Sequence, residues 1–307
     1  MNTLRKLNES IFKNIGADTK KDAEEIFKKL TGLTSRPNRS EWGGQIMRII
    51  YDGCYDIVIP REAFIDGVIP PFIRLVYNVN PTSTGDIKIL IGGMGYRGTP
   101  GETQIQSLDG VEVNGRVNMV NMHVYGCDIK SRDILNTILW KGSYKIPRVY
   151  TISASGMKDV SGFNGMSPDT LYIGEDMPKG CLADMFKVMP RATTANINVD
   201  SYDITPEDWK TICKWSSAGN EGLYVSARDC SVFDPPSRLT YPDRTSFNLD
   251  MTTCEHIDFN KIYLPPRMRS IVAPNKFTDK IKSRWHALWD GKKDTLEPVL
   301  CQRQIRF

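Results

Sequence analysis

Short stretches in which apolar and polar residues alternate recur along the middle of the chain, over residues 46–258. In Val117–Tyr125, for example, Met122 and Val124 alternate with the polar Asn121. A period of two residues places successive side chains on opposite faces of a strand, so these stretches predict sheets that bury one face. The predicted strands are Ile46–Tyr51, Tyr55–Pro60, Phe72–Val79, Asp86–Ile91, Val111–Val113, Val117–Tyr125, Val149–Ser153, Thr170–Ile173, Ala195–Val199, Gly222–Ser226 and Ser246–Met251.

The aliphatic composition also favours strands. The chain has 29 Ile and 17 Val but 18 Leu, and β-branched residues favour strands whereas Leu favours helices. Phe72–Val79 and Asp86–Ile91 flank the polar turn Asn80–Gly85, which predicts a hairpin and therefore antiparallel pairing. The pattern thus predicts a mainly β protein, an antiparallel β-sandwich of the jelly-roll kind with a few crossover helices.

The first 35 residues have helical spacing instead. Apolar residues recur every three or four positions on both sides of Gly16, and Gly32 follows the second stretch as a stop signal. This pattern predicts an N-terminal amphipathic helical arm, whose apolar stripe packs either on its own domain or on a neighbouring subunit. The candidate subunit contacts are Leu4, Ile11, Phe12, Ile26 and Phe27.

Further helices are predicted between and after the strands. Thr205–Trp215 has the clearest signals, because Thr205 can cap the helix and Pro206 suits its first turn. The other predicted helices are Ser131–Trp140, Leu182–Val188 and Phe277–Trp289.

A second architecture fits the spacing of five of the predicted strands. Strands near Val149, Leu171, Ile197, Leu223 and Phe247 recur every 22–26 residues, which is within the period of leucine-rich repeats. Against that template, the first apolar position of four repeats is occupied by Pro, Thr, Asn or Arg. A degenerate leucine-rich-repeat solenoid therefore stays open as the alternative fold.

Residues that could carry chemistry are scattered along the chain. The seven cysteines include no C-x-x-C pair, and the three histidines lie far apart. Gly93–Gly98 spells G-x-G-x-x-G, but Thr99-Pro100-Gly101 follows where a nucleotide site needs a helix. We therefore predict a non-enzymatic protein with no catalytic, cofactor or metal site and no small-molecule substrate. An enzyme that assembles dispersed acids stays open, with the candidates Asp56, Asp66, Asp86, Asp109 and Asp128.

Positive charge is concentrated in the last part of the chain. The net charge is +4, and residues 261–307 contain 11 Lys and Arg against 4 Asp and Glu. A near-neutral body with a basic C-terminal segment suits a polyanion such as RNA or DNA, to which tryptophans can add base stacking. The candidate nucleic-acid contacts are Lys280, Lys282, Arg284, Trp285, Trp289, Lys292 and Lys293.

The sequence offers no signal for a membrane span or for secretion. No apolar run approaches the roughly 18 residues that cross a bilayer, and no apolar stretch of a signal peptide follows the charged N-terminus. The odd number of widely spaced cysteines favours reduced thiols. We therefore expect an intracellular (cytoplasmic) location.

The layout resembles the single-jelly-roll proteins of RNA viruses, namely coat proteins and the related 30-kilodalton movement proteins. The parts are the helical arm (1–45), the β-rich body (46–264) and the basic C-terminal segment (265–307). This resemblance implies a coat-type structural protein that self-assembles into a homo-oligomer and contacts nucleic acid non-specifically, with the virion as an alternative location. Movement proteins typically have an Asp just after the strand that here is Ile87–Ile91, where this chain has Gly92. A viral movement protein and a leucine-rich-repeat-like protein–protein interaction module stay open as alternatives.

Overall fold

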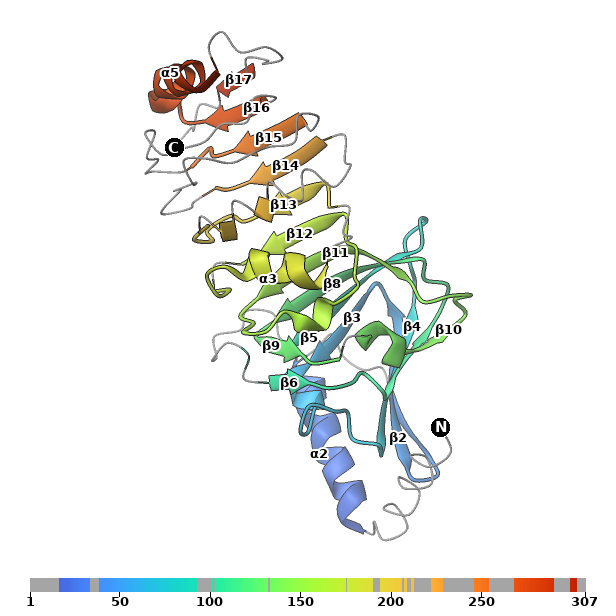
Figure 1. Cartoon of the computed structure of the whole chain (residues 1–307). Helices are drawn as coiled ribbons and strands as arrows, with labels where there is room; N and C mark the ends of the chain where they lie inside the picture. The colour runs from blue at the N-terminus through green and yellow to red at the C-terminus, as the bar shows by residue number, and fades with distance from the viewer. Residues whose placement is uncertain are drawn as a thin grey trace.

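The fold is that of a computed structural model, in which strands predominate over helices (Figure 1). The structure describes residues 17–33, 39–92, 101, 103–131, 133–174, 176–189, 194–205, 207–208, 211–212, 222–228, 246–253, 268–289 and 299–302. The helices are α2 (Ala17–Leu33), α3 (Cys181–Val188) and α5 (Thr278–Trp289), with the 3-10 turns η2 (Arg61–Ala63), η3 (Ile134–Thr137), η4 (Ser161–Phe163) and η5 (Asn275–Phe277). The strands are β1 (Arg39–Gly43), β2 (Ile46–Cys54), β3 (Asp56–Pro60), β4 (Ile73–Val79), β5 (Asp86–Gly92), β6 (Thr103–Ile105), β7 (Val111–Asn114), β8 (Met119–Tyr125), β9 (Cys127–Ile129), β10 (Leu139–Lys141), β11 (Arg148–Ser155), β12 (Thr170–Ile173), β13 (Asn196–Asn198), β14 (Gly222–Ser226), β15 (Ser246–Asp250), β16 (Met268–Ala273) and β17 (Val299–Gln302).

Two large sheets and one small one contain all these strands. The five-stranded sheet has the order β1-β2-β4-β7-β10, and the ten-stranded sheet has the order β17-β16-β15-β14-β13-β12-β11-β8-β5-β3. Strands β6 and β9 form the small sheet. The pair β1–β2 is antiparallel, and every other pair of strands, including β2–β4, is parallel.

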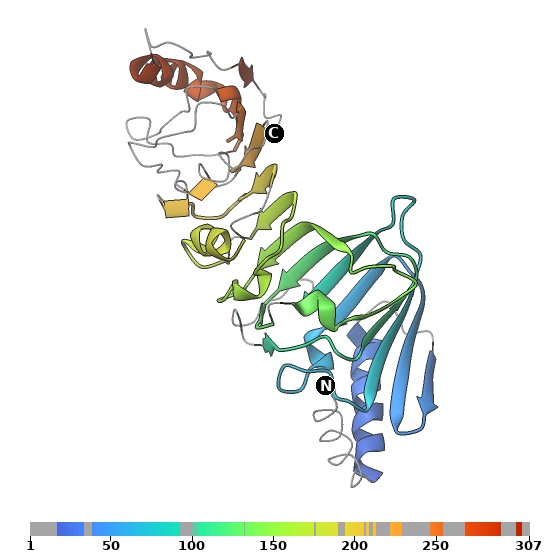
Figure 2. The same ribbon diagram turned by 45° about the vertical axis from the view of Figure 1, so that its right-hand side comes forward.

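The chain winds in coils that stack in sequence order. In the N-terminal half each coil gives one strand to the five-stranded sheet and the next strand to the ten-stranded sheet, as β4 and β5 or β7 and β8 do. Among the described residues, only the ten-stranded sheet continues from β12 onward, and it ends at β17, which follows helix α5 in the chain (Figure 2). The predicted boundary at residue 264 falls between β15 and β16 of this sheet, so the sheet runs on past that boundary.

The mainly β prediction is confirmed, whereas the antiparallel jelly-roll sandwich is not. The predicted hairpin is wrong, because β4 pairs with β2 and β7 while β5 pairs with β3 and β8, all in parallel. The polar turn between β4 and β5 is therefore a corner that carries the chain from one sheet to the other. Hydrophobic alternation identifies the buried face of a strand, but it does not identify the neighbour or its direction.

A continuous row of apolar side chains runs along the inner face of the ten-stranded sheet. Its members are aligned as register partners from strand to strand, and each is 0 or 1% exposed. The row consists of Ile57, Ile89, Met122, Ile152, Leu171, Ile197, Val225, Leu249 and Ile271. Each coil alone would leave its residue of this row exposed at the end of the stack, and the next coil buries it. The stacked coils therefore share a single core.

Helices cover the core at three places along the stack. Leu30 of α2, Leu182 of α3 and Ile281 of α5 are fully buried in the same core cluster. The predicted helices at 182–188 and 277–289 are thus confirmed, and so is the second half of the N-terminal arm. The predicted helix Ser131–Trp140 is wrong, because the turn η3 and strand β10 occupy that segment. In the part of the chain that is described, no helix combines the length and apolarity needed to cross a bilayer.

The Asp208 side chain ties the segment after β13 to helix α3. Its Oδ1 accepts the backbone N–H of Leu182 at 3.1 Å, and its Oδ2 accepts the N–H of Gly180 at 3.2 Å and the Tyr202 hydroxyl at 2.9 Å. The Thr205 N–H and hydroxyl also donate to Oδ2, at 3.0 and 2.7 Å. In return the Thr205 hydroxyl accepts the Asp208 N–H at 3.1 Å, which confirms the predicted cap.

We expect Asp208→Ala to lower the free energy of unfolding by about 3 kcal/mol or more, because it leaves several buried donors without an acceptor. Urea denaturation followed by circular dichroism measures this change. Asp184→Ala is the matched control, since Asp184 is exposed and its ion pair with Lys187 lies in solvent. Equal stabilities for the two variants would contradict the assignment of Asp208 as a buried hub.

Candidate ligand-binding face

The ten-stranded sheet has a second face, which points away from the core and which we call the outer face. Its side chains form two register rows that alternate with the inner apolar row. The first row is Asp56, Lys88, Asn121, Thr151, Thr170, Asn196, Tyr224, Asn248 and Ser270, and the second row is Val58, Leu90, His123, Ser153, Tyr172, Asn198, Ser226, Asp250 and Val272. Amides, hydroxyls and rings therefore predominate over the middle of this face.

Four tyrosines, which we call the outer tyrosines, lie on this face. They are Tyr125 on β8, Tyr150 at the bulge of β11, Tyr172 on β12 and Tyr224 on β14. The last three are 42, 44 and 37% exposed, so their rings are open to a ligand. Sheet order and register place Tyr125, Tyr172 and Tyr224 on every second strand of the sheet. Going from Tyr125 to Tyr172, and again from Tyr172 to Tyr224, the register position moves two residues toward the N-terminal end of the strands. These three rings therefore follow a diagonal across the face.

Hydrogen bonds within the protein hold the C-terminal end of this diagonal. The Tyr224 hydroxyl donates to Asp250 Oδ2 at 3.2 Å, and the same oxygen accepts Arg228 Nε and Nη2 at 3.0 and 2.7 Å. Burial pushes the pKa of Asp250 upward, but hydrogen bonds from Thr252 and Arg228 outweigh it and keep this pKa below its usual value. Burial and the nearby Asp250 raise the pKa of Tyr224. The ring is thus fixed beside an ionised carboxylate.

A second carboxyl group links strand β13 to the turn after β14. Asp200 Oδ1 accepts the Ser226 hydroxyl at 2.7 Å and the Arg228 backbone N–H at 2.8 Å. Its Oδ2 accepts Asn198 Nδ2 at 3.1 Å. Arg228 is therefore held twice, by Asp200 at its backbone N–H and by Asp250 at its guanidinium, which is not an unpaired cation.

His123 and Tyr125 form a polar pair on strand β8. His123 Nδ1 lies 3.1 Å from the Tyr125 hydroxyl. Partial burial, which disfavours the charged ring, and the positive charge of Lys88 lower the pKa of His123 from 6.5 to about 4, with Asp56 acting in the opposite direction. The imidazole is therefore neutral at physiological pH and can serve as a hydrogen-bonding group.

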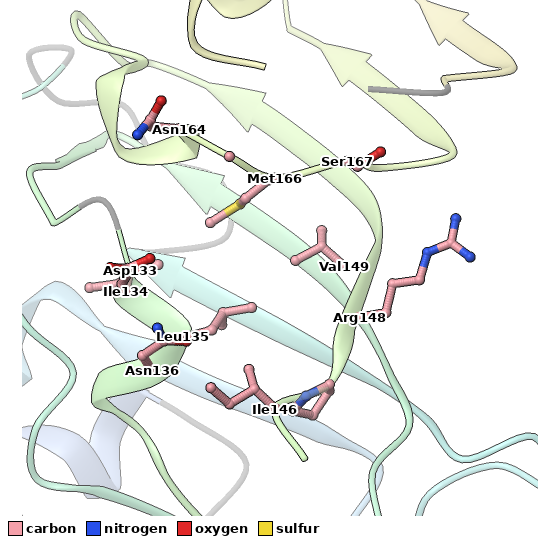
Figure 3. A pocket seen from close by; sticks show the side chains of 12 residues that line it. Asp133, Ile134, Leu135, Asn136, Ile146, Arg148, Val149, Asn164, Met166 and Ser167 are labelled. Atoms are coloured by element: carbon pink, nitrogen blue, oxygen red, sulfur yellow. The ribbon is translucent and has the colours of Figure 1, made fainter. Parts of the chain in front are cut away.

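A pocket of about 430 Å³ lies beside the start of β11, between η3 and the segment after η4 (Figure 3). Leu135, Ile146, Val149 and Met166 line its interior, and their side chains point toward one another (Figure 3). The Arg148 guanidinium points away from the pocket (Figure 3) and binds Asp169 at 2.7 Å. The lining also includes the polar residues Asp133, Asn136 and Ser167, so the pocket has a mixed wall whose interior can pack an apolar group.

The predicted nucleic-acid contacts are only partly accessible. Lys280 and Lys282 are exposed on α5, and Arg284 is half-buried. Trp285 is only 5% exposed and belongs to the core, so its ring cannot stack on a base in this arrangement. The side chain of Trp289 lies outside the described residues, as do Lys292 and Lys293.

The predicted subunit contacts that the structure describes pack within their own chain. Ile26 is 7% exposed in the core cluster, and Phe27 is partly buried against it. The apolar stripe of α2 is thus covered by the protein's own core, and contact with a neighbouring subunit stays a prediction. Leu4, Ile11 and Phe12 lie outside the described residues.

Metal ligands, thiols and buried acids are the remaining candidate groups among the described residues. Among them, no three His, Cys, Asp or Glu residues gather in a way that could hold a metal ion. Burial raises the pKa values of the Cys127 and Cys181 thiols to about 12, so neither forms a nucleophilic thiolate. Asp128 is buried and accepts the backbone N–H groups of Lys158 and Asp159 at 2.7 and 3.0 Å, which is a structural role. The glycine-rich loop, Gly93–Gly98, lies outside the described residues.

Sequence reasoning missed the outer tyrosines. The available signal was that Tyr172 and Tyr224 occupy the polar positions of strands that otherwise alternate, so a large ring stands where a small polar side chain would suffice. Their alignment on one face requires the parallel register between strands, which the sequence pattern does not specify.

We expect the imidazole of His123 to titrate near pH 4 and not near 6.5. Because the pKa in the folded state lies below that of the unfolded chain, the stabilising contribution is complete above about pH 6.5 and is lost as the pH falls toward 4. Nuclear magnetic resonance of the histidine side chains measures the titration, with His123→Gln identifying the signal. A midpoint near 6.5 would contradict the environment described for His123.

No protein-family model, curated protein or solved structure matches this chain. The function must therefore be argued from the geometry of the outer face and the chemistry of its side chains.

Proposed function

We propose that the protein is a non-enzymatic interaction module that binds its ligand on the outer face of the ten-stranded sheet. The observation that carries this proposal is the diagonal of tyrosines on parallel strands, in which Tyr172 and Tyr224 are exposed and Tyr125 is half-buried. Stacked coils produce long regular surfaces, and repeat proteins use such surfaces for binding. In plan the chain is thus similar to the leucine-rich-repeat alternative that the strand spacing suggested.

The rigidity of the face supports this proposal. Buried side chains fill its inner side along the whole row from Ile57 to Ile271. The helices α2, α3 and α5 add side chains to that same core. Rings fixed on a rigid scaffold lose little conformational entropy when they bind a ligand, which favours affinity.

The coat-type function has less support. The expectation of self-assembly came from a resemblance in layout to single-jelly-roll proteins, whose sandwich is antiparallel, and the observed pairing is largely parallel. The lysines of α5 could still contact a nucleic acid, but Trp285, half of the proposed stacking pair, is buried. Self-association and the movement-protein alternative stay predictions, as does nucleic-acid binding, which the oligonucleotides in the experiment below also test.

The experiment selects ligands with the wild-type chain and then compares their affinities for the wild type and for a variant of the outer face. Purified protein is used to probe a random-peptide library, a glycan array and a set of oligonucleotides, at low and high salt. We expect the selected ligands to lose at least about tenfold in affinity for Tyr172→Ala/Tyr224→Ala, because two stacking rings are removed. Binding is then quantified by isothermal titration calorimetry.

Tyr144→Ala is the matched control, since Tyr144 is 95% exposed in the loop between β10 and β11 and does not belong to the outer face. This variant should keep the wild-type affinity. Selected ligands that bind the double variant as tightly as the wild type would show that the outer face is not the binding surface.

A further inference from the structure

We infer that the ligand of the outer face is a linear, uncharged polysaccharide. This inference rests on the proposed function and names the chemical class that the face would bind. Three properties of the face support it, namely the spacing of its rings, the balance of its charges and the hydrogen-bonding groups between the rings.

The rings are spaced for a chain-like ligand. Tyr125, Tyr172 and Tyr224 stand on every second strand and shift by two residues at each step. Two strand spacings are about 9.6 Å and two residues along a strand about 6.6 Å, so successive rings lie about 12 Å apart. A chain of several pyranose units can span such a row, and the flat C–H face of a sugar ring packs well on an aromatic ring.

The charges of the face are compensated within the protein. Arg148 binds Asp169 at 2.7 Å and Arg228 binds Asp250 at 2.7 Å. Lys88 is the register partner of Asp56 on the neighbouring strand. Two further carboxyls, those of Asp176 and Asp200, bind protein hydroxyls and backbone N–H groups. The face thus offers no surplus of positive charge, and a nucleic acid would gain little by counterion release.

The groups between the rings match hydroxyls. Asn196 is exposed on β13, between Thr170 on β12 and Tyr224 on β14 in the same register row. Ser153 and Asn198 are the register partners of Tyr172 on either side, and the Asn198 carboxamide already makes one donor and one acceptor bond with Asp200. Carboxamides and hydroxyls both donate and accept hydrogen bonds, and so does every sugar hydroxyl. This pairing lets a sugar keep the hydrogen bonds that it made with water.

An extended peptide fits the same face less well. A peptide backbone has one directional N–H and one C=O per residue, and it binds most readily to a free strand edge. On the outer face these backbone groups are already used in the parallel ladder, since strands β8 to β14 have a neighbour on both sides. Only side chains can reach the ligand, which favours a ligand with hydroxyls pointing in several directions.

The test is affinity electrophoresis in native gels that contain a soluble neutral polysaccharide, with a β-glucan, a mannan, a galactomannan and a dextran as separate probes. We expect at least one of them to retard the wild-type chain to the same extent at low and high salt. Calorimetry with oligosaccharides of increasing length from that polysaccharide should then give an affinity that rises with length, since more rings are engaged.

Variants of one ring separate stacking from hydrogen bonding. Tyr172→Ala should weaken binding about tenfold. Tyr172→Phe should retain most of the affinity because it keeps the ring, and Tyr144→Ala should retain all of it. Because Tyr172 is 44% exposed, its replacement leaves the core intact, and circular dichroism checks this.

The outcomes distinguish this inference from the proposed function. If no neutral polysaccharide binds but a selected peptide or oligonucleotide binds through Tyr172 and Tyr224, the glycan inference is overturned and the interaction module stands. Glycan binding that Tyr172→Ala and Tyr224→Ala leave unchanged also overturns the inference. If no ligand of any class depends on these rings, both proposals fail.

Discussion

The structure depends on the stacking of apolar side chains in register across the ten-stranded sheet. Each coil contributes one residue of the row, which packs between the residues of the two adjacent coils, as Ile152 lies between Met122 and Leu171. A single coil cannot bury this residue on both sides, so the free energy of burial is gained only as coils are added. The same register that aligns the core residues also aligns the outward residues, and therefore the binding face is a direct consequence of the core.

The strands were largely predictable because their alternation is local. Thr170–Ile173 and Gly222–Ser226 coincide with β12 and β14. The direction of pairing was not predictable from the polar turn after β4, since a turn of that composition can also link two sheets. The spacing of 22–26 residues carried the correct information about neighbouring strands. Its alignment was wrong at two of the four steps, since Ile152 and not Val149 is the partner of Leu171, and Val225 and not Leu223 is the partner of Ile197.

The candidate face was less predictable than the fold. The basic residues near the C-terminus led to the prediction of a nucleic-acid site, because charge can be counted in the sequence. The exposure of an aromatic ring cannot be counted in this way. Trp285 and Tyr172 illustrate this difference, since the tryptophan is 5% exposed and the tyrosine 44%. Helical spacing that puts Trp285 in line with Ile281 favours burial, and strand parity that puts Tyr172 beside Leu171 favours exposure.

The acidic residues show why a stack of coils needs well-placed carboxyl groups. Asp128 accepts backbone N–H groups thirty or more residues later in the chain, and Asp200 and Asp208 make equivalent bonds between other segments. Turns between parallel strands leave N–H groups without ladder partners, and a buried carboxyl satisfies several of them at once. Dispersed acids in this sequence therefore fasten one coil to the next. That fastening keeps the strands in register, and it is the register that holds Tyr125, Tyr172 and Tyr224 in one line.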